Sequence, residues 1–186
     1  MAGDRDVSAV SALLAGLLLL SACSRERGEM MPTFELVDQT GSIVRSDDLR
    51  GHVLVVSFVF TTCAEACPLI TAQLARTQRR VRTEKLDQRV RFVSITLDPA
   101  TDRPAVLRRY ADRYGIDPAS WSLLTGAADD VSRVVRAFGL SAVARERVVH
   151  GSLVVLVDDK GRIAERRTDL ELDPDRLLGS LRKLLG

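Results

Sequence analysis

Apolar positions along the chain fall into two kinds of run, which predict alternating strands and helices. A nearly continuous apolar run covers residues 53–60, a pattern typical of a strand that is buried on both faces, and residues 90–97 are expected to form a second buried strand. Residues 68–85 and 104–114 instead repeat their apolar positions with the spacing of a helix. The first half of the domain is therefore predicted to run strand, helix, strand, helix.

Turn residues mark a hairpin toward each end of the domain. Apolar segments 34–37 and 43–44 flank a polar turn, and segments 152–157 and 163–167 flank the turn Asp158-Asp159-Lys160-Gly161. Both pairs are predicted to form antiparallel hairpins.

Three further elements are predicted in the second half. Residues 121–124 form a short strand, and residues 129–138 form a helix with Gly139 just beyond its end. Asp173 and Pro174 open a last amphipathic helix, in which the aspartate is the cap and the proline occupies the first turn.

Strands that alternate with helices and are bracketed by hairpins predict an α/β fold with a central mixed sheet flanked by helices on both faces. Residues 33–186 are enough for one such domain with a sizeable core. A cysteine pair on the first strand-to-helix loop makes the thioredoxin-like fold, with an N-terminal hairpin, the expected architecture.

The chain begins with a segment typical of export. Residues 7–22 are apolar or small, and this stretch is too short for a membrane span of about 20 residues. Leu20-Ser21-Ala22-Cys23 resembles the bacterial lipobox, which implies that residues 1–22 are a signal peptide and that Cys23 is acylated. The alternative, a buried helix of the fold, is disfavoured because the tetra-leucine block has no polar face.

Residues 23–32 are predicted to be the acylated cysteine and a tether, since they are polar, lack a periodic pattern and end in Pro32. The domain is thus expected to be lipid-anchored on the periplasmic side of a bacterial membrane. In such an oxidising compartment, two nearby thiols tend toward a disulfide unless they are kept reduced.

Charge adds one exclusion. The chain has 27 Lys and Arg against 25 Asp and Glu, a formal net charge of +2. The basic residues are spread along the chain, and Arg79-Arg80 and Arg108-Arg109 are expected on solvated helix faces. Nothing in this distribution indicates a nucleic-acid partner.

Cys63 and Cys67 are the main candidates for chemistry. They follow a buried strand directly and precede Pro68, so they are expected at a helix N-terminus, which favours thiolate over thiol. Positions i and i+4 share a helix face, which suits metal chelation and also allows a disulfide. Two soft thiolates favour Cu(I), and a disulfide would abolish binding. The alternative is a pair of inert core cysteines.

His150 is the candidate third ligand. It precedes the strand 152–157, on the loop where a thioredoxin-like protein usually has a cis-proline, and an imidazole there would suit Cu(II) as well as Cu(I). The alternative is a surface or hydrogen-bonded histidine.

His52 is expected to be exposed and structural, at the edge away from Cys63. Zinc fits less well than copper, because a closed structural zinc site needs four ligands and the sequence offers three.

Together these residues resemble the Sco/SenC family of copper-binding, thioredoxin-like assembly factors for cytochrome c oxidase. The resemblance covers nearly the whole mature chain and rests on residues 58–68, Asp98-Pro99 with Asp102 and Pro104, residues 121–126, and His150 ahead of 156–158. The chain departs from the family pattern at Ala64 and Glu65, usually proline and aspartate, and at Val149, usually aspartate.

The resemblance implies that Cys63, Cys67 and His150 are the copper ligands. It also implies subunit II of cytochrome c oxidase as the client, with other periplasmic copper chaperones or thiol reductases as further partners. Asp98 and Asp102 could serve partner docking, or equally a loop or helix cap.

Two functions remain open on the sequence. One is a metallochaperone that delivers copper. The other is a thiol-disulfide oxidoreductase that reduces the client's cysteines, with Cys63 and Cys67 as the redox pair. The two can coexist.

We expect the precursor to be cleaved before Cys23 and acylated there. Cys23→Ala should leave an uncleaved or unanchored chain with unchanged copper binding, because the anchor is separate from the Cys63 and Cys67 pair. Mass spectrometry of the mature N-terminus and copper analysis of the variant check this. Loss of copper from Cys23→Ala would show that the sulfur assignment is wrong.

Overall fold

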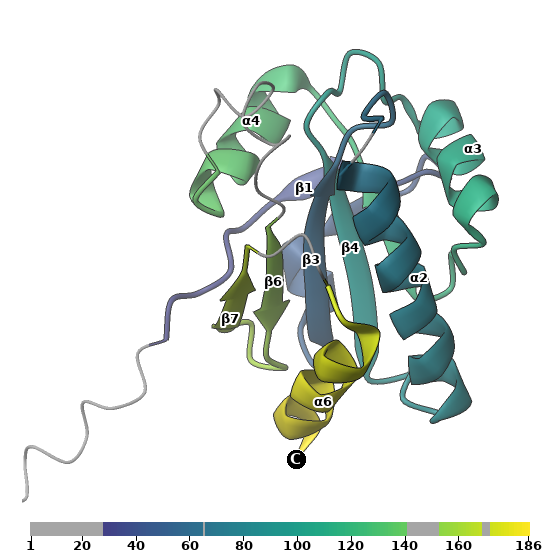
Figure 1. Cartoon of the computed structure of the whole chain (residues 1–186). Coiled ribbons are helices and arrows are strands. Elements are labelled where there is room, and N and C mark those ends of the chain that lie inside the picture. The colour runs from purple at the N-terminus through teal and green to yellow at the C-terminus, as the bar shows by residue number, and fades with distance from the viewer. Residues whose placement is uncertain (1–27, 65, 141–152, 169–171) are drawn as a thin grey trace, which may run out of the picture.

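The computed structural model describes residues 28–64, 66–140, 153–168 and 172–186 (Figure 1). The signal segment, Cys23 and His150 lie outside these ranges. In chain order the elements are β1 (Glu35–Val37), β2 (Ile43–Arg45), the 3-10 helix η2 (Ser46–Leu49), β3 (Val53–Val59), α2 (Ala66–Thr83), β4 (Val90–Thr96), α3 (Pro104–Tyr114), β5 (Trp121–Leu124), α4 (Ala128–Ala137), β6 (Val154–Val157), β7 (Ile163–Arg167) and α6 (Pro174–Leu185).

β3 is the middle strand of a five-stranded mixed sheet with the order β5-β4-β3-β6-β7. It runs parallel to β4, with Val53 opposite Val90, and antiparallel to β6, with Leu54 opposite Val157. All seven of its residues are buried, as the continuous apolar run predicts. The predicted mixed sheet is therefore confirmed.

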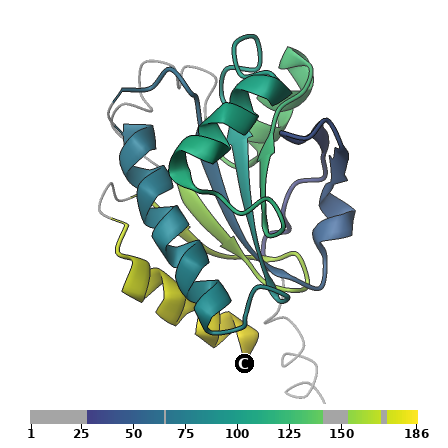
Figure 2. The same cartoon turned by 90° about the vertical axis from the view of Figure 1, so that its right-hand side faces the viewer.

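Helices cover both faces of the sheet, as expected (Figures 1 and 2). α2, α3 and α6 contribute to one core, in which Leu74, Leu107 and Leu177 are buried with inward side chains of β3 and β4. On the other face, α4 contributes to a second core together with the N-terminal segment around Phe34 and Leu36. Two cores on opposite faces are what a strand buried on both sides requires.

The N-terminal hairpin is present and is held at the end of β5. β1 and β2 pair antiparallel, and Val37 and Thr125 exchange two backbone hydrogen bonds of 2.8 Å. The buried Gln39 side chain donates to the Trp121 carbonyl at 3.0 Å and accepts from Leu123 N–H at 2.7 Å. These bonds satisfy polar backbone groups that the hairpin would otherwise bury unpaired.

The predicted helix ends agree with the structure within two residues. α2 begins at Ala66 rather than residue 68 and ends at Thr83, and Lys85 beyond it adopts a left-handed φ of 58°. Asp173 caps α6 as predicted, accepting from Asp175 N–H at 2.8 Å. Gly139 follows α4 with a φ of 91°, a conformation that glycine adopts without strain.

One expectation is wrong. His52 lies at the far end of β3 from the cysteines, as predicted, but it is half-buried rather than exposed, and its Nδ1 is buried with no hydrogen-bond partner among the described residues. The backbone holds this turn on the domain, since Gly51 N–H donates to the Asp159 carbonyl at 2.8 Å and His52 N–H donates to the Leu49 carbonyl at 3.4 Å. None of the helices in the described ranges is long and apolar enough to cross a membrane.

Candidate metal and redox site

The cysteine pair follows the carboxyl end of β3. A turn follows the strand, closed by a 3.1 Å hydrogen bond from Cys63 N–H to the Phe60 carbonyl. Cys63 lies in this loop and is half-buried, whereas Cys67 lies in the first turn of α2 and is only 3% exposed. The sequence expectation of a cysteine pair at a strand-to-helix junction is confirmed.

The two sulfurs are brought together by a turn rather than by a shared helix face. Cys63 precedes the helix, and its Sγ accepts a 3.4 Å hydrogen bond from Cys67 N–H. The Cys63 sulfur thus lies over one of the backbone donors that a helix N-terminus leaves without an intrahelical partner.

Burial dominates the chemistry of Cys67. Loss of solvation, with smaller contributions from the nearby Cys63 and Asp102 and against a lowering hydrogen bond with the Phe60 backbone, raises the pKa of this thiol to about 12. The expectation that the helix N-terminus favours the thiolate is therefore wrong for Cys67 as it stands. The dipole acts only within the first turn and is modest, whereas the buried anion loses most of its hydration.

Asp102 holds the loop that carries Cys63 in place through hydrogen bonds. Its carboxylate is fully buried and accepts from Thr61 N–H at 3.1 Å, from the Thr61 hydroxyl at 2.5 Å and from the Thr96 hydroxyl at 2.6 Å. Thr96 ends β4, so the carboxylate joins the loop after β3 to the end of the neighbouring strand. Charge-assisted bonds of this kind are among the stronger ones in proteins.

These bonds decide between the roles left open for Asp102. The N-cap of α3 is Arg103, without a side-chain cap, so the helix-cap role is wrong for Asp102 and the loop role is confirmed. The carboxylate is fully buried and offers no surface for partner docking in this structure. The backbone N–H of Asp98 donates to the Thr96 hydroxyl at 2.9 Å, which adds this residue's backbone to the same network.

A neutral hydroxyl pair lies beneath the site. Thr71, one helical turn after Cys67, and Tyr110 of α3 are both buried, and their hydroxyl oxygens are 2.7 Å apart. Burial raises the pKa of Tyr110 against a lowering hydrogen bond with Thr71, and Tyr114 and the two cysteines add smaller increases. Sequence reasoning missed Thr61, Thr71 and Tyr110. Thr61 adjoins the motif and could have been suspected, but no local signal identifies Tyr110.

A third ligand is not part of the described site. Among the described residues, no group of three His, Cys, Asp or Glu side chains could hold a metal ion. His150, the predicted third donor, falls in the range 141–152, outside the described part of the chain. The structure thus brings together two of the three predicted ligands, and the full set stays a prediction.

Comparison with protein families settles the relationship of this chain. The model of the family described as SCO1/SenC matches residues 23–186. The chain belongs to the SCO1/SenC family. A Stutzerimonas stutzeri relative, named as a candidate copper-binding protein, is 32% identical over 166 residues, or 86% of this chain and 77% of the relative.

Solved structures share the fold of this SCO1/SenC chain. BsSco, described as a member of the Sco family of cytochrome c oxidase assembly proteins with a disulfide switch, is 25% identical with a TM-score of 0.74, over 85% of this chain and 94% of that one. A SCO1/SenC family lipoprotein from Bacillus anthracis str. Ames is 25% identical with a TM-score of 0.72, over 89% and 100%. These likenesses confirm the thioredoxin-like fold.

We expect the two thiols to differ sharply in alkylation. In the reduced, metal-free chain, iodoacetamide should modify Cys63 first, and the Cys67 rate should still rise about tenfold per pH unit near pH 10, because its raised pKa leaves little thiolate. Mass spectrometry of the two peptides over time measures this. In urea both rates should level off near an ordinary pKa of about 8.5. A folded-state Cys67 rate that levels off below about pH 9 would contradict the burial argument.

We expect Asp102→Ala to lower the free energy of unfolding by about 2–3 kcal/mol, because Thr61 N–H and the Thr96 hydroxyl lose a buried acceptor. Asp102→Asn should cost less than half as much, since its amide keeps one acceptor oxygen. Urea unfolding measures both, and Asp112→Ala, an exposed aspartate of α3, is the control. Equal effects of Asp102→Ala and Asp112→Ala would show that the hydrogen bonds of Asp102 contribute no stability.

Proposed function

We propose that this protein is a lipid-anchored copper chaperone that holds copper through Cys63, Cys67 and His150 for assembly of the copper centre of cytochrome c oxidase subunit II. One observation carries the proposal. The Cys63 sulfur lies over the first turn of α2 beside Cys67, at the carboxyl end of the central strand of a SCO1/SenC fold.

The donor chemistry fits copper. Two thiolates form a soft pair that prefers Cu(I), and an imidazole would extend the set to Cu(II). Copper that binds the pair takes the place of the Cys67 proton, so binding favours the thiolate that burial disfavours in the metal-free protein. The relative from Stutzerimonas stutzeri, named for copper binding, supports this cargo.

The proposed location follows from the lipobox-like segment that ends at Cys23. A lipid anchor there would hold the domain on the periplasmic side of the membrane, and the related lipoprotein from Bacillus anthracis supports it. Residues 29–31 already lie against β7, where Ile163 N–H donates to the Glu29 carbonyl at 2.7 Å and Met31 N–H donates to the Gly161 carbonyl at 2.9 Å. The tether therefore leaves the domain beside the hairpin of β6 and β7.

Reduction of client disulfides is the second candidate. The contact of Cys67 N–H with Cys63 Sγ supports it, because it brings two thiols into one turn, and so does the disulfide switch described for BsSco. In such a reaction one thiolate attacks the client's disulfide and the other cysteine resolves the mixed disulfide. A protein oxidised in this way has no thiolates left for copper.

We expect the reduced chain to bind about one copper per molecule, and Cys63→Ser or Cys67→Ser to abolish most of that binding, because one thiolate with an imidazole is a poor soft-metal site. His150→Ala should weaken Cu(II) binding much more than Cu(I) binding. Metal analysis and visible absorption spectra of the full chain measure both. No loss of either ion in His150→Ala would remove the histidine from the ligand set.

Transfer to a client separates the two functions. Copper-loaded chain mixed with reduced, copper-free subunit II should hand over copper, while His150→Ala should fail in transfer and still reduce a disulfide-bonded client, since exchange needs only the two sulfurs. Transfer of no copper by the wild-type chain, together with rapid reduction of the client, would make the reductase the main function.

A further inference from the structure

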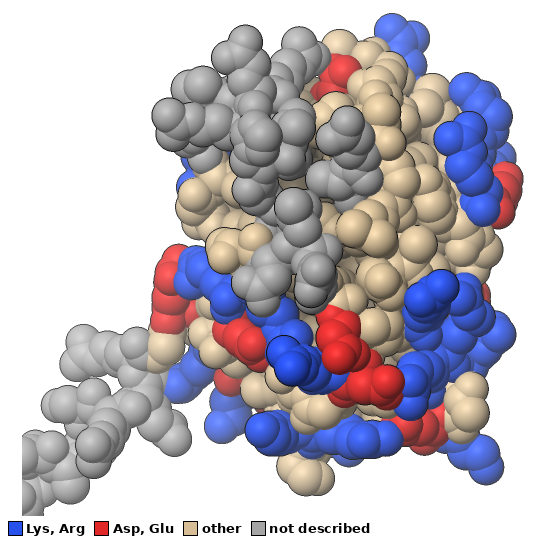
Figure 3. Space-filling model, in the orientation of Figure 1, with Lys and Arg blue, Asp and Glu red and all other residues tan. Residues whose placement is uncertain are grey.

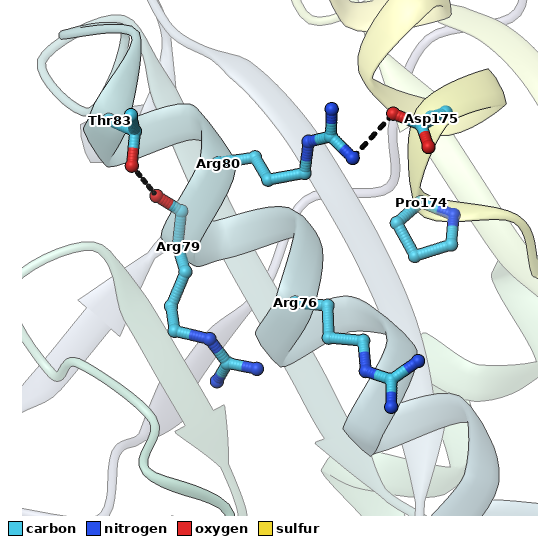
Figure 4. A pocket seen from close by; sticks show the side chains of 6 residues that line it. All are labelled: Arg76, Arg79, Arg80, Thr83, Pro174 and Asp175. Carbon is cyan, nitrogen blue, oxygen red and sulfur yellow. Dashed lines mark hydrogen bonds and ion pairs between the residues drawn. The ribbon is translucent and has the colours of Figure 1, made fainter.

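Arginine side chains line a hollow between α2 and α6. Its volume is about 410 Å³, and Figure 4 shows its six lining residues, which are Arg76, Arg79, Arg80 and Thr83 of α2 and Pro174 and Asp175 of α6. α2 contains no acidic residue along its whole length. In the space-filling view, Lys and Arg side chains lie over the lower and right-hand parts of this face, with Asp and Glu side chains among them (Figure 3).

Positive charge in the hollow exceeds negative charge. Arg80 reaches across to Asp175 and forms an ion pair of 2.5 Å. Arg76 and Arg79 are exposed, and within the described residues neither guanidinium has an ion pair or a hydrogen bond. The hollow thus presents three guanidinium groups and one carboxylate.

Nearby acidic side chains are already engaged elsewhere. Asp117 pairs with Arg82 at 3.2 Å, and Glu84 pairs with Arg182 at 2.5 Å. Each of these carboxylates is thus already paired with an arginine that does not line the hollow. The excess positive charge is therefore concentrated at Arg76 and Arg79.

We propose that the hollow binds an acidic segment of a protein partner, with Arg76 and Arg79 holding its carboxylates. A guanidinium presents two parallel N–H donors that match the two oxygens of a carboxylate. A phospholipid surface fits less well, since a flat anionic layer would meet the exposed carboxylate of Asp175 as well as the arginines, whereas one protruding acidic chain can enter the hollow beside it.

The position of the hollow relates it to the cysteine pair. Arg76 follows Cys67 by nine residues on the same helix, which corresponds to about 14 Å along the axis. A standard interface buries about 800 Å² on each partner, a patch roughly 30 Å across, which exceeds this distance along the helix. Leu69, 47% exposed on the helix surface between them, offers an apolar contact in the same patch. Leu69 and Arg76 are seven residues apart and so share the outer side of α2, opposite the buried Cys67, and a partner docked on this side extends toward the amino-terminal end of the helix, which Cys63 precedes.

The test uses the reduced, metal-free full-length chain in detergent and a fluorescein-labelled octaglutamate peptide, followed by fluorescence anisotropy. We expect salt-dependent binding that Arg76→Glu with Arg79→Glu weakens at least tenfold. The matched control is Arg109→Glu with Arg113→Glu, two exposed arginines of α3, which makes the same change in net charge and should weaken binding less than threefold. Circular dichroism verifies that both variants are folded.

The outcomes are distinct. Failure of the peptide to bind, or equal weakening in both double variants, would overturn the proposal. Displacement of the peptide by glycerophosphoglycerol, the soluble head group of an anionic phospholipid, at a lower concentration than by unlabelled octaglutamate would also overturn it in favour of a phosphate ester. The proposal rests on the proposed function only in that the docked partner would receive copper. Because the binding test uses the metal-free chain, failure of the peptide to bind does not imply that the chain fails to bind copper, and the reverse also holds.

Discussion

Burial of β3 on both faces is the constraint on which the rest of the structure depends. Seven consecutive buried residues need a layer on each side, and the two cores supply them, one with α2, α3 and α6 and the other with α4 and the N-terminal segment. Neighbouring strands satisfy the backbone of β3 on both edges. Because the strand is held on every side, its carboxyl end is a fixed point, and the reactive loop begins there.

Desolvation and hydrogen bonding act in opposite directions at that loop. Cys67 is buried, which makes its thiolate costly in the metal-free protein, while Asp102 stays in place because it accepts hydrogen bonds from Thr61 and Thr96. The carboxylate also opposes a second negative charge on Cys67. A pair in such surroundings favours a bound cation, since the cation relieves both costs at once.

α2 connects the chemistry to the surface. Its first turn holds Cys67, its inner side buries Leu74, and its outer side passes from Leu69 to the arginines of the hollow. One rigid helix therefore sets the distance between the proposed docking contact and the proposed metal site. Thr71 and Tyr110 form a buried pair of hydroxyl groups one helical turn beyond Cys67, so Asp102 is the buried carboxylate of the site.

The sequence by itself determined the order of elements, the buried central strand, the cap of α6 and the placement of Cys63 and Cys67 at the first strand-to-helix junction. Each of these depends on local periodicity or on the chemistry of a few adjacent residues. Only the tertiary structure decided the state of Cys67, the half-burial of His52 and the roles of Asp102 and Tyr110. Those properties depend on groups from other elements that folding brings near, such as Thr61 for Asp102, which lies 41 residues away. Burial and long-range hydrogen bonds have no local signature in a sequence, because solvation is a property of the packed molecule.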